Sequence, residues 1–180
     1  HPQRCAAMLA PLQPDLIICC GMPWILPPDL IALPRLGAIN LHPALLPQYR
    51  GPAAIEWAFR NGDTETGFTA HWIAPELDTG AILAQERVTI ADDDTVETLL
   101  TKFSGIMPRL LQRALTRVAA GDPGDPQDES RASYAGLFDE AWRHIRWDRP
   151  ARLVHNQVRS WTGVRDIPNG AFGEVAGERL

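Results

Sequence analysis

Two short apolar runs joined by a short link constrain the fold of this chain more than any other feature. Residues 15–20 (DLIICC) form a continuous apolar run, which is typical of a strand buried on both faces. Residues 37–42 (GAINLH) predict a second strand, and residues 27–33 predict a short helix between the two. Strand, helix and strand with short links form a βαβ unit, so we expect the two strands to be parallel.

The rest of the chain adds helices and a hairpin. Helices are predicted at residues 4–12, 52–60, 95–120 and 150–161, and strands at 66–74 and 81–90. The two strands are joined by residues 75–80, so an antiparallel hairpin is expected. Asp94 and Glu97 resemble a capping box at the start of the long helix, and Gly121 closes it. The last helix has apolar positions at Leu153, Val154, Val158 and Trp161.

Polar side chains gather where the second strand ends. Asn40 and His42 are two residues apart, so on a strand they project from the same face. Pro43 lacks an N–H and ends the strand. Open α/β sheets bind ligands at the carboxyl ends of their strands, which makes Asn40 and His42 candidate functional residues. We interpret His71, in the predicted hairpin, as a surface or packing residue.

Asp78-Thr79-Gly80 invites a different interpretation, because Asp-Thr-Gly is an aspartic-protease signature. Such a protease pairs two carboxylates, so this chain with its single copy would have to form a homodimer. Aspartic proteases are also all-β proteins, whereas Asp78 lies between a βαβ pattern and a long helix. The sequence therefore disfavours this alternative.

Composition sets the broad class. The 180 residues have the hydrophobic and charged content of a soluble globular protein, and no apolar run approaches the roughly 20 residues that span a bilayer. The net charge of −5 argues against a broad phosphate-binding surface. Cys5, Cys19 and Cys20 form neither a disulfide framework nor a metal-ligand set, so we expect reduced thiols, a cytoplasmic location and no metal. Because the chain begins with His1, we expect its true start to lie upstream.

Three motifs in one order resemble the formyltransferase family that uses 10-formyltetrahydrofolate. They are Asn40-Leu41-His42-Pro43, residues 45–51 (LLPQYRG) and residues 77–80 (LDTG). The resemblance implies an α/β fold with a Rossmann-like, mostly parallel sheet that lacks its N-terminal half here. It also implies three parts: a catalytic domain (residues 1–120), a linker with a helix (121–163), and the start of a C-terminal β-rich, OB-like domain (164–180).

The resemblance also implies a site. The reduced folate 10-formyltetrahydrofolate would be the co-substrate, covered on one side by Met22, Trp24, Ile25 and Leu26 and wrapped on the other by Pro75, Glu76 and Leu77. The catalytic residues would be Asn40, His42 and Asp78. Asn40 and a protonated His42 would donate to the developing oxyanion, while Asp78 holds His42 in that protonation state and raises its pKa.

The acceptor stays open at this point. Initiator methionyl-tRNA is the first candidate, followed by an amino sugar or a hydroxylated amino acid, because residues 145–172 match the linkers of tRNA and sugar enzymes equally well. A 10-formyltetrahydrofolate hydrolase is a further alternative, although Asn40 favours transfer. A folate-binding module without turnover is disfavoured, because Asn40, His42 and Asp78 are all present. The oligomeric state is not predicted.

Overall fold

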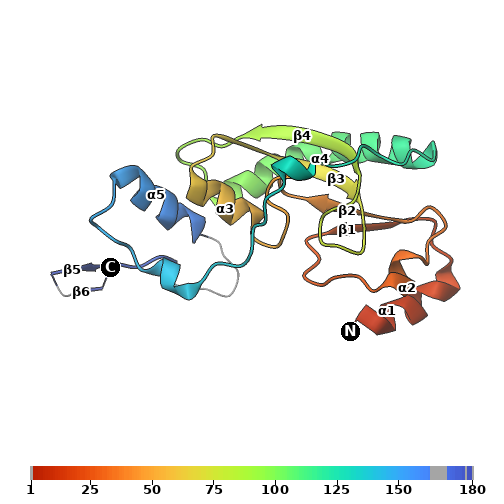
Figure 1. Cartoon of the computed structure of the whole chain (residues 1–180), viewed down its shortest axis with the longest axis horizontal. Coiled ribbons are helices and arrows are strands. Elements are labelled where there is room, and N and C mark those ends of the chain that lie inside the picture. Colours follow the sequence, from red (N-terminus) through yellow and green to blue (C-terminus); the bar gives the residue numbers. More distant parts are fainter. Residues whose placement is uncertain (1, 163–169, 177, 180) are drawn as a thin grey trace.

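A sheet with helices along its sides organises the molecule, which is elongated (Figure 1). The computed structural model describes residues 2–162, 170–176 and 178–179. Its helices are α1 (Pro2–Leu9), α2 (Pro28–Ile31), α3 (Ala54–Asn61), α4 (Val96–Ala119) and α5 (Ala151–Ser160). Its strands are β1 (Ile17–Cys20), β2 (Ala38–His42), β3 (Glu65–Trp72), β4 (Ile82–Thr89), β5 (Glu174–Val175) and β6 (Glu178–Arg179). Short 3₁₀ turns occupy Ala10–Leu12, Glu129–Arg131 and Glu140–Arg143.

The main sheet has the order β1-β2-β3-β4 and mixed direction. β1 and β2 are parallel, as the βαβ pattern predicts, and the β3–β4 hairpin is antiparallel, also as predicted. The α/β fold is confirmed, and the sheet is mixed because β3 also runs antiparallel to β2. In the described part of the chain β1 lies at one edge of the sheet and Ile18 is 43% exposed, so the predicted burial of β1 on both faces is not seen there.

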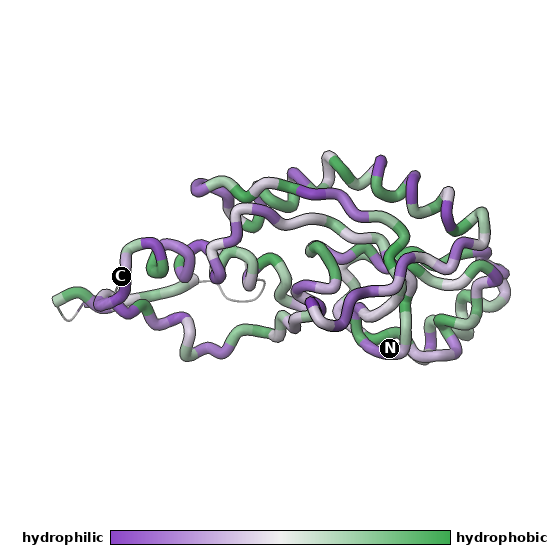
Figure 2. Tube along the Cα trace, turned by 45° about the horizontal axis from the view of Figure 1, so that its top comes forward, coloured by the Kyte–Doolittle hydropathy of each residue, from purple (hydrophilic) through white to green (hydrophobic). Residues whose placement is uncertain are grey.

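Helix α4 covers one face of the sheet and closes the main core. The rings of Phe68 on β3 and Phe103 on α4 stack with centroids 5.0 Å apart. Hydrophobic and hydrophilic residues alternate along α4, as Figure 2 shows, so one side of the helix is available for burial. Leu99, Leu110 and Ala114 from that side are fully buried in the core.

The start of α4 differs from the prediction in its capping residues. The capping box is formed by Thr95 and Thr98, each of whose hydroxyls binds the backbone N–H of the other. Asp94 lies one residue earlier, where its carboxylate accepts from the N–H of Ala91 and pairs with Lys102. The predicted partner Glu97 takes no part in the box, because Thr98 occupies the third helical position.

Helix α5 buries a polar face, contrary to its predicted apolar positions. Leu153 and Val158 are 47% and 42% exposed, although Trp161 is buried as expected. The buried face carries Asn156, Gln157, Arg159 and Ser160. These groups are accommodated because Gln157 donates to two backbone carbonyls and the Arg159 guanidinium lies 5.0 Å from the Phe59 ring.

The predicted division into domains stays a prediction. The expected boundary after residue 120 coincides with the end of α4, and that after residue 163 lies outside the described residues. Beyond it, β5 and β6 pair as a small antiparallel ribbon.

Two neighbouring leucines of α4 test this account of the core. Leu99→Ala removes a side chain with 0% exposure, so we expect a loss of about 2–5 kcal/mol in the free energy of unfolding. Leu100→Ala makes the same chemical change at a site that is 48% exposed, and should shift that energy by about 0.5 kcal/mol or less. Urea unfolding followed by circular dichroism measures both; equal losses would contradict the placement of α4.

Candidate active site

Strand β2 carries the first two residues of the site. Asn40 and His42 project from one face. Ile39, which precedes them, and Leu41, which lies between them, are buried in the main core. His42 is buried, with 4% exposure, and its Nε2 lies 2.8 Å from the carbonyl oxygen of Tyr49. A carbonyl only accepts, so Nε2 carries a hydrogen and Nδ1 faces the site.

The turn between β3 and β4 delivers Asp78. Asp78 has a φ of 55°, in the left-handed region, and its carbonyl oxygen accepts from the Gln127 side-chain amide at 2.8 Å. The same amide also donates to the carbonyl oxygen of Gly80. A side chain at Gly80 would meet the carbonyl oxygen of Trp72 at 1.7 Å, so only glycine fits there. Gln127 and Gly80 thus fix the turn that aims the carboxylate.

The carboxylate of Asp78 lies between β2, β3 and the loop after β2. Its Oδ2 accepts from the N–H of Gly51 at 2.8 Å and lies 3.5 Å from His42 Nδ1. Its Oδ1 lies 3.4 Å from the Asn40 amide nitrogen and 3.6 Å from His71 Nε2. The structure therefore brings Asn40, His42 and Asp78 together, although 36 residues separate the latter two in the sequence.

Burial decides the charge state of His42. Desolvation lowers the pKa of His42, and this effect outweighs the nearby Asp78 carboxylate, which raises it. The expectation of a raised pKa is therefore wrong, because the ring is more deeply buried than a strand end suggests. Burial also raises the pKa of Asp78. His71, His42 and the Gly51 N–H lower that pKa by more than burial raises it, so the net pKa lies below its ordinary value. A neutral imidazole thus faces a carboxylate anion.

Sequence reasoning missed His71, which it placed on the surface or in packing. His71 is 2% exposed and lies in the site, 3.3 Å from the Asn40 amide nitrogen. The β2–β3 register pairs Asn40 directly with His71 across the sheet. Cross-strand partners lie on the same face, so this register would have revealed the contact.

The loop that follows β2 is held by a segment from beyond α4. The backbone of Arg50 pairs with Ser133 and Ala135, with an N–H to oxygen distance of 2.9 Å to Ser133. The Arg50 guanidinium binds the side chains of Gln127 and Glu129. Residues 127–135, which lie in the predicted linker, therefore support the loop whose Gly51 binds Asp78.

The predicted folate-contacting residues are brought together only in part. Ile25, Leu26 and Pro75 line one cavity of about 240 Å³, which joins the loop after β1 to the turn after β3. The other lining residues are Pro28, Ile31 and Ala32. Met22, Trp24, Glu76 and Leu77 do not line it and are exposed.

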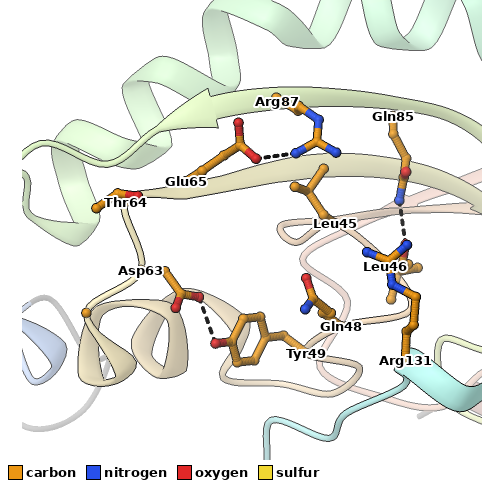
Figure 3. Close-up of a pocket in the computed structure, with 11 residues that line it drawn as sticks. Leu45, Leu46, Gln48, Tyr49, Asp63, Thr64, Glu65, Gln85, Arg87 and Arg131 are labelled. Atoms are coloured by element: carbon orange, nitrogen blue, oxygen red, sulfur yellow. Dashed lines mark hydrogen bonds and ion pairs between the residues drawn. The ribbon is translucent and has the colours of Figure 1, made fainter.

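A second, polar cavity of about 450 Å³ lies beside residues 45–49 (Figure 3). Its polar groups pair mainly with one another: Tyr49 donates to Asp63 at 2.7 Å, and Glu65 pairs with Arg87. Burial, together with Asp63, raises the pKa of Tyr49 to about 12, so the phenol keeps its hydrogen. These contacts anchor the ring of the residue whose carbonyl binds His42.

The described part of the chain contains no group of His, Cys, Asp and Glu side chains that could hold a metal ion. None of its helices has the length and apolar character to cross a membrane.

Comparison with known proteins places this geometry in a family. The model of the formyl transferase family matches residues 1–115, and the chain belongs to that family. It is 38% identical to a methionyl-tRNA formyltransferase from a Synechococcus species, covering 98% of this chain and 62% of that protein. It is also 38% identical to the methionyl-tRNA formyltransferase of Moorella thermoacetica, covering 94% of this chain and 56% of that protein. The chain thus spans less than two thirds of these relatives.

Solved structures confirm the fold. HypX from Aquifex aeolicus, in complex with tetrahydrofolic acid, superposes with a TM-score of 0.83 at 21% identity, covering 99% of this chain and 30% of that one. A 4-N formyltransferase from Francisella tularensis superposes with a TM-score of 0.79 at 20% identity, covering 100% of this chain and 74% of that one. At these identities the likeness concerns the fold alone.

Two glycines test the support of Asp78. An added Cβ at Gly51 would lie 2.7 Å from the Tyr134 ring and 2.8 Å from the Ala135 carbonyl oxygen, at a φ of +113°. Gly51→Ala should therefore destabilise the protein by about 1–3 kcal/mol and disturb the carboxylate. Gly105→Ala is the control, because it lies in α4 with open space around it and should stabilise by about 0.5–1 kcal/mol. Urea unfolding compares the two; a neutral Gly51→Ala would show that the loop is adaptable.

Proposed function

We propose that this chain carries the catalytic site of an enzyme that transfers a formyl group from 10-formyltetrahydrofolate to an amine, with methionyl-tRNA as the acceptor. The observation that carries the proposal is the convergence of Asn40, His42 and Asp78 within hydrogen-bond or near-contact distance. Family membership supports the reaction class, and the methionyl-tRNA formyltransferases at 38% identity support methionyl-tRNA as the proposed acceptor. A cytoplasmic location belongs to the same proposal.

The charge states suit acyl transfer between nitrogens. The amine attacks the formyl carbon and forms a C–N bond, and the bond to N10 of the folate then breaks. One proton must leave the attacking nitrogen and one must reach N10. A neutral, buried His42 can accept the first, and the imidazolium so formed is stabilised by the Asp78 carboxylate 3.5 Å away. The same proton can then pass to N10, which balances the reaction.

The apolar cavity supports binding of the folate ring. It lies between the loop after β1 and the turn that ends in Asp78. Pro75, which lines the cavity, precedes Asp78 by three residues in the sequence. Its volume of about 240 Å³ is below the roughly 300–1,000 Å³ of a typical ligand pocket. It would therefore hold one ring system and leave the rest of the folate outside, against Met22, Trp24, Glu76 and Leu77.

An acceptor panel tests the reaction and its substrate. The full-length protein is incubated with radiolabelled 10-formyltetrahydrofolate and, separately, with methionyl-tRNA, uncharged tRNA, UDP- and dTDP-amino sugars, or no acceptor. We expect label on methionyl-tRNA alone. His42→Ala should lower the rate of labelling by at least about 10²-fold, the scale of losing a general base. His155→Ala, at an exposed position, is the control. Label on an amino sugar would overturn the acceptor, and formate release alone would indicate a hydrolase.

The pH profile tests the pairing of His42 with Asp78. Transfer needs neutral His42, so activity should fall as pH drops through its pKa, which lies below the ordinary value of 6.5. Asp78 raises that pKa, so Asp78→Asn should move this acid limb to still lower pH and lower kcat by about 10²–10⁴-fold.

Asp92→Asn is the control for this pH experiment, since it removes one negative charge at an exposed site paired with Arg152. The measurement is kcat/KM from about pH 5 to 8, the range in which histidine titrates. An acid limb that stays in place in Asp78→Asn, or moves equally in both variants, would show that Asp78 does not act through His42.

A further inference from the structure

His71 has a defined tautomer because of its own backbone neighbour. Its Nδ1 lies 2.8 Å from the carbonyl oxygen of Trp72, which can only accept, so Nδ1 carries the hydrogen. In the neutral ring Nε2 is then an acceptor. It lies 3.3 Å from the amide nitrogen of Asn40. A proton on Nε2 as well would leave two donors facing each other at that distance, while Asp78 Oδ1, 3.6 Å from Nε2, lies beyond hydrogen-bond distance of it.

Asp78 restricts the Asn40 amide independently. Its Oδ1 is an acceptor 3.4 Å from the same amide nitrogen. Turning the amide over would place its oxygen against the carboxylate, which is repulsive. The two hydrogens of the Asn40 amide are therefore directed at two acceptors, His71 Nε2 and Asp78 Oδ1.

The carbonyl oxygen of Asn40 is left for a substrate. Asn40 is half-buried. In the described part of the structure its Oδ1 has no hydrogen-bond partner, and this oxygen is accessible, not enclosed. An amide oxygen can only accept. Asn40 thus offers an acceptor to whatever binds beside His42, and an oxyanion would be repelled by it.

We propose that Asn40 accepts an N–H of the attacking amine, and that His71 is a positioning residue that fixes the Asn40 amide in the required orientation. This inference rests on the proposed formyl transfer. With one N–H held by Asn40, the lone pair of the amine is aimed at the formyl carbon beside His42. An amine has a single lone pair that must be aimed, whereas water, the competing nucleophile, has two, so its attack depends less on this contact.

The ratio of transfer to hydrolysis distinguishes this role from that of an oxyanion donor. His71→Leu removes the acceptor from Asn40, whereas His71→Gln can restore one. In the full-length protein we expect His71→Leu and Asn40→Ala to slow formyl transfer by about 10²-fold, the scale for a misplaced reacting group, and to slow formate release by much less. His71→Gln should recover part of the transfer rate, and His155→Leu should alter neither rate. If transfer and formate release fall in parallel, Asn40 stabilises the oxyanion and the proposal is wrong.

A second readout needs no activity. Nitrogen-15 NMR of histidine-labelled protein reports the tautomer of each ring, and the His71 signal is assigned by its loss in His71→Gln. We expect a protonated Nδ1 and a bare Nε2 for His71. A protonated Nε2 would overturn the positioning role whatever the enzyme transfers, and a protein with the expected tautomer but no formyl transfer would instead refute the proposed function.

Discussion

The buried carboxylate of Asp78 is the interaction on which the site depends. It is ionised and only 9% exposed, and a charge in such a place is tolerated only with donors around it. The backbone N–H of Gly51 and the Asn40 amide supply those hydrogens, because the nitrogens of His42 and His71 that face the carboxylate carry none in the neutral rings. The loop after β2, strands β2 and β3 and the hairpin turn must therefore keep their relative positions, because a shift in any of them would leave the charge unpaired.

The same environment moves two pKa values downward for different reasons. Burial penalises the charged form of His42 and lowers its pKa, whereas the surrounding donors lower that of Asp78 despite its burial. At neutral pH the site thus holds a neutral base beside a fixed anion, the arrangement that lets one group take up a proton while the other stabilises the result. Had the carboxylate dominated, His42 would be charged in the resting state and unable to accept a proton.

The local patterns predicted the elements well and the contacts between them unevenly. The alternation around Asn40 and His42 placed both on one face, and the hairpin was recognised from its strand composition and turn. His71 was missed because its position depends on the β2–β3 register, which no local pattern reports. The polar face of α5 was missed because periodicity identifies apolar residues, whereas Gln157 and Arg159 bind backbone carbonyls that lie at least 13 residues away in sequence.

The support of the site extends beyond the segment that defines the family. The family match ends at residue 115, yet the Gln127 amide holds the carbonyl oxygens of Asp78 and Gly80. Ala135 pairs with Arg50 and Ala53 on either side of Gly51, the residue that binds the carboxylate. A boundary drawn after α4 would separate the Asp78 carboxylate from the groups that orient it. The polar segment after α4 therefore supports the candidate site and is more than a spacer between elements.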